Sequence, residues 1–402
     1  MLRFLTAGES HGRTLVVILE GLPAGLSIDT DAIARDLRRR QGGYGRGRRM
    51  AIESDRADIV SGVRAGETLG GPVAMLIENR DWQNWQYTMR ATAEFVAPED
   101  ATGGARRAAV TRPRPGHADL AGGAKYERDD LRDVLERASA RETAARVAAG
   151  ALARQLLARA GVRISSHVFT LGGITVPNRD RITFDQAAAL QDDAPLRCVD
   201  HDLEQTMIAE IDRAREAGDT LGGAFEVIAT GVPVGLGSYV QWDRKLDGRL
   251  AQALMSIPAI KAVGIGLGPE AASRPGSRVH DEIVSGDTSR ATLLARPTNN
   301  AGGLEGGVTN GEDVRVSVFM KPISTLMKPL RSVDLATMTE APAAIERSDV
   351  CAVPAAAVVG EAMVALVLAD ALLERFGGDS MAALERAMSS ADATMRARFS
   401  PR

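Results

Sequence analysis

The sequence predicts a soluble globular protein built from both strands and helices. Its 402 residues are 45% hydrophobic and 25% charged, which is typical of soluble globular chains. Short apolar runs bounded by turn residues alternate with longer segments in which apolar residues recur at helical spacing. A chain of this length can bury a large core, as one domain or two, without disulfides or metals.

Charge and cysteine content exclude several classes of protein. The net charge of −3 argues against a surface built to bind nucleic acid, because such binding needs many cations against phosphates. Cys198 and Cys351 lie outside any C-x-x-C spacing, so we expect neither a metal site nor a disulfide. The N-terminus lacks the long apolar core of a secretory signal, and a cytoplasmic protein in a reducing compartment is expected.

Two strands joined by a polar loop are expected in residues 2–21. Turn residues between β-prone runs are typical of a hairpin, and this loop, G-E-S-H-G-R, carries Ser10, His11 and Arg13. A hydroxyl, an imidazole and a guanidinium can together donate hydrogen bonds to a phosphate. The alternative is an ordinary polar hairpin loop.

A helix with a basic end is expected next, followed by a glycine-rich loop. Asp29 or Thr30 can cap this helix, and its last turn is Arg38–Arg40, where cations oppose the negative helix end. Residues 41–49, Q-G-G-Y-G-R-G-R-R, then place more arginines among flexible glycines. These arginines can form a solvated charge run, an RNA-binding patch with Tyr44 as a stacking residue, or a flexible clamp for a small polyanion. The glycines favour the clamp.

Strands are expected in residues 57–78, which contain apolar runs and turn glycines. The segment after them concentrates large aromatic side chains, Trp82, Trp85 and Tyr87. Concentrated aromatics usually pack at an interface or under a loop, so we predict packing for them and no chemistry.

The stretch 112–143 is predicted to be a catalytic loop that leads into a ligand-binding helix. Arg112 and Arg114 each precede a proline, which restricts the backbone to extended conformations and gives His117 a stiff frame. Gly116 permits a tight turn or the close approach of a ligand. A proton donor among guanidinium groups suits an anionic substrate, whereas a surface histidine without a task is the alternative.

One long helical pattern is expected between Asp129 or Asp130, which can cap it, and Gly161. Residues 137–143, R-A-S-A-R-E-T, form a polar patch in its middle. The patch marks a ligand-facing surface, a break in the helix or a solvent-exposed face.

The second half of the chain is predicted to add more strands and helices. These are strands at residues 162–176, 224–234 and 314–320, a polar helical region at 184–217 and a helix at 246–255. The G-x-G-x-G at 264–268 lacks the strand-turn-helix spacing of a dinucleotide site.

Two further segments suit the binding of a phosphate. Residues 298–311 are almost all turn formers, which can offer backbone N–H groups to an anion. Lys321–Thr325 supplies a cation and two hydroxyls.

The C-terminal part begins with a carboxylate before an apolar segment. Asp349 can act as a proton relay or as a structural cap for a helix in residues 353–373. Glu361 and Asp370 lie inside this apolar segment, so we expect a buried helix and not a membrane span. The last dozen residues are expected to be flexible.

Eight motifs in order along the chain together resemble the chorismate synthase family. They are G-E-S-H-G, Q-G-G-Y-G-R-G-R-R, R-P-R-P-G-H-A-D, R-A-S-A-R-E-T-A, M-S-I-P-A-I-K-A-V, A-G-G-L-E-G-G-V-T-N-G, K-P-I-S-T and R-S-D-V-C-A-V-P-A, and the resemblance runs from about residue 3 to 375. The last motif departs from many members, which read R-H-D-P-C where this chain has R-S-D-V-C.

The resemblance implies a fold, a reaction and a cofactor. The fold is α+β, a β-α-β sandwich in which central helices lie between antiparallel sheets, as a single domain of residues 1–402 that assembles into a homotetramer. The reaction is the reduced-FMN-dependent 1,4-elimination of phosphate from 5-enolpyruvylshikimate 3-phosphate to give chorismate, the last step of the shikimate pathway to aromatic amino acids. NADPH is the candidate reductant, and neither nucleic acid nor a membrane is an expected partner.

The matching motifs also imply functional positions. Flavin-binding positions are Arg137, Ala138, Ser139, Gln252, Ala253, Gly306, Lys321, Pro322, Ile323, Ser324, Thr325 and Arg347. Positions for substrate or NADPH are Ser10, Arg40, Arg46 and Arg49. His11, His117 and Asp349 match catalytic positions: His11 would protonate or stabilise the departing phosphate, His117 would keep the reduced flavin neutral or singly charged, and Asp349 would assist removal of the proton.

Two other functions are open on the sequence alone. An RNA-binding protein that uses the arginine-glycine loop would retain nucleic acid in a salt-dependent manner. A flavin-dependent oxidoreductase would show net redox turnover. Phosphate release without stoichiometric consumption of NADPH distinguishes the lyase from both.

Overall fold

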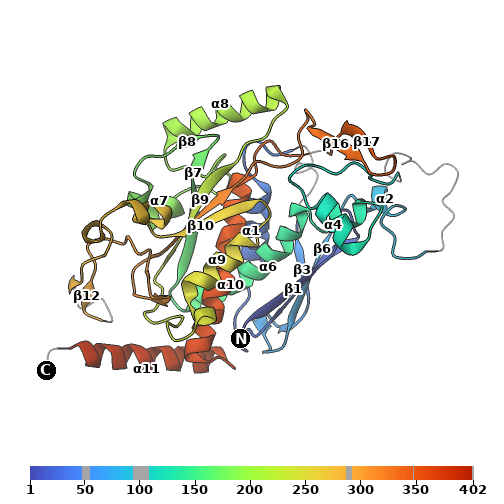
Figure 1. The fold of residues 1–402 in the computed structure, drawn as a ribbon. Helices are drawn as coiled ribbons and strands as arrows, with labels where there is room; N and C mark the ends of the chain where they lie inside the picture. Colours follow the sequence, from blue (N-terminus) through green and yellow to red (C-terminus); the bar gives the residue numbers. More distant parts are fainter. Residues whose placement is uncertain (48–54, 94–107, 287–291, 347, 401–402) are drawn as a thin grey trace.

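Two antiparallel sheets enclose a layer of helices (Figure 1). The computed structural model describes the whole chain except residues 48–54, 94–107, 287–291, 347 and 401–402. Its central helices lie between the two larger sheets, and one continuous hydrophobic cluster draws side chains from both sheets and from these helices. The α+β sandwich implied by the resemblance is therefore confirmed.

The first sheet has four strands and one buried face. Its order is β1 (Arg3–Ala7), β2 (Thr14–Glu20), β6 (Val73–Glu78) and β3 (Ala57–Ser61), all paired antiparallel. Along β2 every second side chain, Leu15, Val17 and Leu19, is buried. This period of two turns the apolar side chains towards the helices. The hairpin predicted for residues 2–21 is confirmed. A small hairpin, β4 (Val63–Arg64) and β5 (Glu67–Thr68), joins β3 to β6.

The second sheet has five strands and is more deeply buried. Its order is β10 (Ile260–Ile265), β15 (Val314–Met320), β9 (Gly223–Thr230), β7 (Arg163–Leu171) and β8 (Ile174–Thr175), again antiparallel throughout. The strand predicted at 314–320 is confirmed, the one predicted at 224–234 ends at Thr230, and the segment 162–176 forms two strands, β7 and β8, joined by a turn. β9 is buried on both faces over Ala224–Ala229, which explains why its sequence reads as a nearly continuous apolar run.

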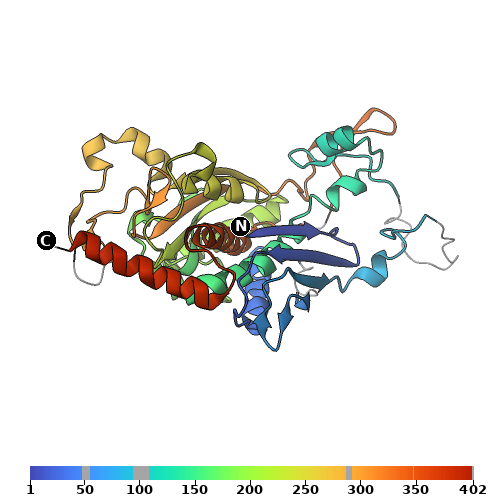
Figure 2. The ribbon, with the colours of Figure 1, turned by 90° about the horizontal axis from the view of Figure 1, so that it is seen from below.

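The central layer consists of α1 (Thr30–Gln41), α6 (Thr143–Arg159) and α10 (Val353–Phe376). Figure 2 shows α10 end-on between the two sheets. Gly150 of α6 meets Ala362 of α10 so closely that an added Cβ would lie 2.3 Å from the alanine Cβ, so glycine is required for this helix crossing. α10 is long and apolar enough to cross a membrane, but 89% of its most apolar 18-residue stretch is buried inside the protein. The predicted buried helix is confirmed.

Shorter elements surround this sandwich. They are the helices α2 (Trp82–Trp85), α4 (Asp119–Tyr126), α5 (Arg132–Leu135), α7 (Phe184–Ala188), α8 (His201–Ala217), α9 (Leu246–Met255) and α11 (Met381–Phe399), and the hairpins β11 (Val284–Ser285) with β12 (Leu294–Ala295), β13 (Leu304–Glu305) with β14 (Val308–Thr309), and β16 (Arg331–Asp334) with β17 (Thr339–Pro342).

Two predicted helical regions are interrupted. The pattern from 129 to 161 forms α5, a 3-10 turn at Ala140–Glu142 and then α6. The break falls at Ser139, which is extended and whose hydroxyl accepts the backbone N–H of Arg141, a contact that competes with continuing the helix. The region 184–217 likewise forms α7 and α8, and Asp200 caps the second of them.

The C-terminal segment forms a helix where the sequence suggested none. α11 continues to Phe399 through most of the last dozen residues, and its buried side chains are Met381 and Leu384 near its start. The far half of α11 therefore extends away from the sandwich (Figure 1). Flexibility of this end in solution stays a prediction.

Candidate active site

His11 lies in the loop between β1 and β2 and is held by the buried carboxylate of Glu136. Its Nδ1 lies 2.9 Å and 3.0 Å from the two carboxylate oxygens, and its backbone N–H donates to Oε2 at 2.8 Å. Because a ring nitrogen facing a carboxylate is the protonated one, Nε2 is the nitrogen that can exchange a proton with a ligand. Glu136 is 1% exposed, so water does not compete for this contact.

An aromatic stack fixes the plane of the same imidazole. The ring centroids of His11 and Trp85 lie 3.8 Å apart with an interplanar angle of 21°. The indole N–H of Trp85 donates to Asp81 at 2.9 Å, which fixes the rotation of the indole. The packing predicted for Trp85 is confirmed, but it supports a candidate catalytic histidine, a role that the sequence analysis did not assign.

Ser10 connects this loop to the segment that follows α5. Its backbone N–H donates to the carbonyl of Glu136 at 2.9 Å, and its hydroxyl accepts from the Ser139 hydroxyl at 3.2 Å. Ser10 was predicted to contact substrate and Ser139 to contact the flavin. The two predicted sets therefore meet beside His11.

His117 uses a second buried carboxylate in the same way. Its Nδ1 lies 2.5 Å from Oδ1 of Asp119, a separation that requires a proton between the two atoms because two bare acceptors would repel. Arg114 holds the same carboxylate, with its Nε 2.8 Å from Oδ2 and its Nη2 3.1 Å from Oδ1. Although burial opposes it, these hydrogen bonds from His117 and Arg114 hold the pKa of Asp119 well below its ordinary value.

The loop that carries His117 is tied to the predicted phosphate-binding segment Lys321–Thr325. Nη1 of Arg114 donates to the Thr325 hydroxyl at 2.9 Å, and the ammonium group of Lys321 donates to the carbonyl of Gly116. The stiff frame predicted from the two prolines is thus reinforced by a charged fork and a lysine. These contacts bring the predicted flavin position Lys321 next to a candidate catalytic histidine.

Asp349 connects the start of α10 to the arginine-glycine loop. Its Oδ2 lies 2.8 Å from Nη1 of Arg46, and its Oδ1 accepts the backbone N–H of Gly47 at 2.7 Å. The helix cap is Ala352, with no side-chain cap bond, so the capping role considered for Asp349 is wrong. Asp349 instead anchors the loop that was predicted to clamp a polyanion.

Arg40 makes buried contacts instead of lying on a solvated surface. It is 4% exposed, and its Nε donates to Thr143 at 2.9 Å. Its Nη1 approaches the buried Asp55 at 3.5 Å, and Arg141 binds that carboxylate at 2.5 Å. For this arginine the interpretation as a solvated charge run is wrong. Its assignment to substrate or NADPH stays a prediction.

The other described flavin positions fall into three groups. Arg137 is exposed and donates to the carbonyls of Thr6 and Gly8, beside the edge of β1, and Ala138 follows it. Gln252 and Ala253 lie near the end of α9, and Gly306 forms the turn between β13 and β14. Pro322 and Ser324 lie within the segment after β15, where the carbonyl of Ile323 accepts from Thr220 at 2.7 Å. Arg49 and Arg347 lie outside the described residues.

Sequence reasoning missed the two carboxylates that orient the histidines. Glu136 is 125 residues away from His11, and no local pattern marks it. Asp119 was visible as the aspartate two residues after His117, within the quoted motif. A His-x-Asp spacing in a stiff loop is the signal that could have identified it.

The chain is similar over nearly its whole length to known proteins. A family model described as chorismate synthase matches residues 2–373. The chain is 57% identical over 390 residues to the chorismate synthase of Moorella thermoacetica, with 97% of this chain and 98% of that protein covered. It is 56% identical over 390 residues to that of Geobacter sulfurreducens, with 96% and 97% covered. A solved crystal structure of a chorismate synthase matches with a TM-score of 0.77 at 42% identity and covers 98% of each chain.

Proposed function

Because the chain belongs to the chorismate synthase family, we propose that His11, His117 and Asp349 are the acid–base groups of its reaction. The chain is a lyase that eliminates phosphate from 5-enolpyruvylshikimate 3-phosphate and forms chorismate, in the shikimate pathway to aromatic amino acids. The observation that carries the proposal is the pair of imidazoles that each place Nδ1 on a buried carboxylate.

The family uses reduced FMN, and two cations of this chain fit an anionic cofactor. The guanidinium of Arg137 contacts only carbonyl and hydroxyl oxygens among the described residues, and the ammonium of Lys321 contacts a carbonyl, so no carboxylate neutralises either charge there. Burial and the neighbouring Lys261 lower the pKa of Lys321, and a bound anion would favour its charged form. Arg137–Ser139 and Lys321–Thr325 would hold the flavin phosphate and polar edge, with Gln252, Ala253, Gly306 and Arg347 as further proposed contacts. When bound, the reduced flavin supplies electron density to the allylic system as phosphate leaves.

The chain's own side chains supply position and protons. Nε2 of His11 donates a proton to the departing phosphate, because the carboxylate of Glu136 holds Nδ1 and supports the positive ring. Nε2 of His117 holds a proton at the cofactor edge. Asp349 assists removal of the substrate proton from the position that Arg46 and Gly47 give its carboxylate.

Arginines at the end of α1 and in the residues after it are proposed to bind the anionic groups of the substrate. Arg46, together with Arg49 and Arg40, neutralises a phosphate and two carboxylates. The same arginines are the proposed contacts for NADPH if this chain reduces its own flavin. We further propose a cytoplasmic homotetramer.

One anaerobic assay tests the proposed function. The protein is incubated with photoreduced FMN and the enolpyruvyl substrate, and phosphate release is measured together with NADPH oxidation. We expect phosphate and chorismate in equal amounts with no stoichiometric NADPH consumption. Stoichiometric NADPH consumption would identify an oxidoreductase, and the absence of phosphate release in wild type would overturn the acid–base assignments.

A further inference from the structure

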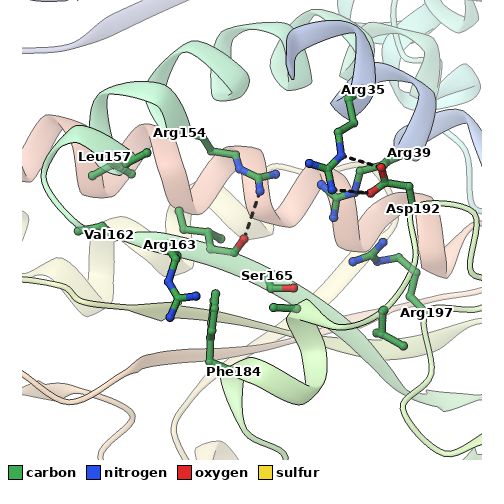
Figure 3. Close-up of a pocket in the computed structure, with 14 residues that line it drawn as sticks. Arg35, Arg39, Arg154, Leu157, Val162, Arg163, Ser165, Phe184, Asp192 and Arg197 are labelled. Atoms are coloured by element: carbon green, nitrogen blue, oxygen red, sulfur yellow. Dashed lines mark hydrogen bonds and ion pairs between the residues drawn. The ribbon is translucent and has the colours of Figure 1, made fainter. Parts of the chain in front are cut away.

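A cavity lined by arginines lies apart from the two histidines. It has a volume of about 280 Å³ and opens between α1, α6, β7 and α7 (Figure 3). Five arginines line it: Arg35, Arg39, Arg154, Arg163 and Arg197. We call this cavity the arginine pocket. None of its lining residues belongs to the predicted catalytic or flavin-binding positions.

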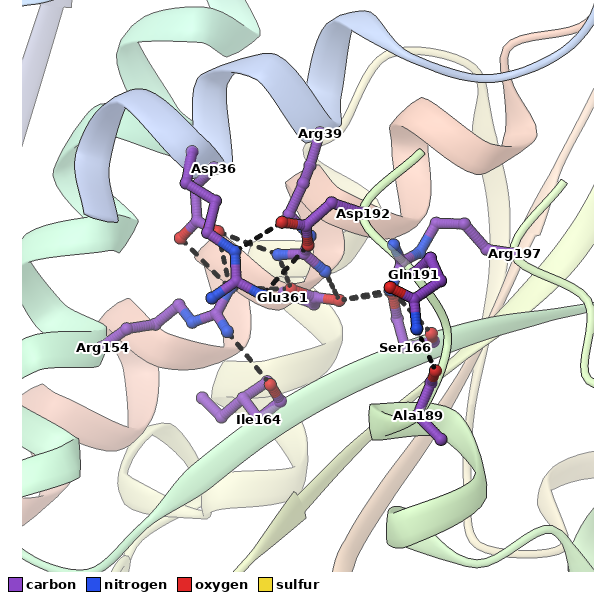
Figure 4. A network of polar contacts seen from close by, with 11 residues as sticks. Asp36, Arg39, Arg154, Ile164, Ser166, Ala189, Gln191, Asp192, Arg197 and Glu361 are labelled. Atoms are coloured by element: carbon purple, nitrogen blue, oxygen red, sulfur yellow. Dashed lines mark hydrogen bonds and ion pairs between the residues drawn. The ribbon is translucent and has the colours of Figure 1, made fainter. Parts of the chain in front are cut away.

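The back wall of the arginine pocket is a network centred on Glu361 of α10 (Figure 4). Glu361 is 0% exposed, and its carboxylate receives Arg39 at 2.8 Å through both oxygens, Arg154 at 2.8 Å and the Ser166 hydroxyl at 2.7 Å. Arg197 lies further away, at 3.5 Å. Three guanidinium groups thus converge on one fully buried carboxylate.

Counting charges around the arginine pocket leaves a positive surplus. Its five arginines face three carboxylates, Asp36, Asp192 and Glu361, a balance of five minus three, or +2. Asp185 also approaches Arg163, at 3.9 Å, but both side chains are exposed, so this pair adds little. The pocket therefore attracts an anion of one or two charges.

Arg197 is the least satisfied group of the arginine pocket. Its side chain is 5% exposed, and its Nε is buried with no hydrogen-bond partner. Burial lowers the pKa of Arg197, the attraction of Glu361 opposes this, and repulsion from Arg39 and Arg154 adds to it. A buried donor without a partner destabilises the protein, and an anion in the pocket would supply the missing acceptor.

One side of the arginine pocket is apolar. Leu157, Val162 and Phe184 line it. The guanidinium of Arg163 lies 4.6 Å from the ring centroid of Phe184, which presents a flat stacked surface at the cavity. A bare inorganic ion would leave this wall in contact with water.

We propose that the arginine pocket binds a small organic anion, with a phosphate or carboxylate head at Arg197 and Arg39 and an apolar, preferably aromatic, body against Phe184. The cavity volume suits a molecule of about ten non-hydrogen atoms, near the lower limit of ordinary ligand pockets. Binding is separate from the elimination reaction.

Calorimetric titration of the full-length protein with phenyl phosphate, benzoate and inorganic phosphate tests this site. Phenyl phosphate should bind more tightly than inorganic phosphate, because only the former covers the apolar wall. Comparing the affinities for benzoate and phenyl phosphate shows whether the pocket prefers a carboxylate or a phosphate head group. Arg197→Gln should weaken phenyl phosphate binding about tenfold or more, and Arg163→Gln, at the rim, about threefold. Arg163→Gln should turn over substrate at the wild-type rate.

Two variants serve as controls. Arg159→Gln removes an equal charge from α6 at a side chain that does not line the pocket, and its binding should match wild type. Arg46→Ala should retain phenyl phosphate binding if the ligand sits in the arginine pocket. Loss of binding in Arg46→Ala with no change in Arg163→Gln and Arg197→Gln would place the ligand in the substrate site and overturn the proposal. If Arg197→Gln fails to fold, Arg163→Gln decides the test. An unchanged affinity of Arg163→Gln for phenyl phosphate would then overturn the proposal.

Discussion

The two histidines are oriented by the same contact and supported by different neighbours. Each places Nδ1 on a carboxylate, Glu136 for His11 and Asp119 for His117. The His11 ring rests on the indole of Trp85, whereas the carboxylate that holds His117 is shared with the guanidinium fork of Arg114. Glu136 also has an arginine partner, Arg132, but at 3.6 Å. Packing therefore adds to a carboxylate contact at His11, whereas a closer charged network holds His117.

This difference matters for what each histidine can do. A ring stacked on an indole and hydrogen bonded through Nδ1 has a fixed plane, which suits delivery of a proton to a leaving group in one direction. Arg114 lies closer to the carboxylate of Asp119, at 2.8 Å, than Arg132 does to that of Glu136, at 3.6 Å, so charge contributes more to the support of His117. Substitutions at the supporting residues separate these two kinds of support.

The largest effect is expected from removing either imidazole. His117→Ala and His11→Ala should each lower turnover by ~10²-fold or more, since one general acid typically contributes that much. The fold should survive, because both imidazoles are partly exposed and neither belongs to the hydrophobic core. His201→Ala is the matched control, because that side chain is 92% exposed and should leave the rate unchanged. If one of the two variants keeps a near-wild-type rate at saturating flavin, the histidine that it lacks is not catalytic.

The charged support should show itself in the pH dependence of stability. Asp119→Asn removes a buried partner of Arg114 and should lower the free energy of unfolding by about 3 kcal/mol at pH 7. The pKa of Asp119 is depressed in the folded protein, so its stabilisation is present above the ordinary aspartate pKa of about 4 and is lost as pH falls below it. Denaturation by urea at pH 7 and pH 3 measures this effect.

The difference between wild type and Asp119→Asn should therefore shrink towards pH 3. Leu152→Ala is the comparison, because Leu152 is a fully buried aliphatic side chain of α6, and the cost of removing its packing should be the same at both pH values. A pH-independent cost of Asp119→Asn would show that Asp119 contributes by packing and not by charge.

Periodicity and capping located most elements, because burial and backbone satisfaction act locally. α9 begins and ends where its helical pattern does, and α1 begins after Asp29, whose carboxylate accepts two backbone N–H groups. The break at Ser139 was one of three interpretations of a polar patch, because the sequence does not show whether a serine hydroxyl bonds its own backbone.

The sequence identified the candidate catalytic side chains but not the residues that orient them, for a physical reason. Both histidines and Asp349 stand in stiff or glycine-rich loops, which local chemistry marks. The sequence does not show which residues pair, since the contact from His11 to Glu136 spans 125 residues and that from Asp349 to Gly47 spans 302. Which carboxylate meets which imidazole is decided by the packing of the sandwich.

Asp349 extends the comparison to a carboxylate whose described partners are an arginine and a backbone N–H. Asp349→Asn should turn over roughly tenfold or more slowly, because an amide cannot take up a proton at neutral pH. Flavin affinity should be unchanged, and the deuterium isotope effect at the substrate C–H should exceed that of wild type. A normal rate with a thermal midpoint several degrees lower would show that Asp349 only anchors the loop of Arg46.

That loop allows a separate measurement of ligand affinity. Arg46→Ala should weaken the binding of substrate, or of NADPH where it binds, about tenfold. The affinity for flavin should change little. Binding isotherms for the three ligands decide this, and Arg38→Ala, an exposed neighbour on α1, is the control. If flavin affinity falls most, the loop contacts the cofactor and the clamp assignment is wrong.

The smallest effect is expected from the packing support of His11. Trp85→Leu keeps an apolar side chain under the imidazole but removes the flat stack, which is worth about 1 kcal/mol in comparable aromatic pairs. The Glu136 contact remains, so His11 should keep its tautomer and lose only its fixed plane, and kcat should fall by about fivefold with little change in KM. Trp85→Phe keeps a flat ring without the indole N–H bond to Asp81 and should recover most of the rate. If Trp85→Phe is as slow as Trp85→Leu, the hydrogen bond to Asp81 positions the histidine, and the stack does not.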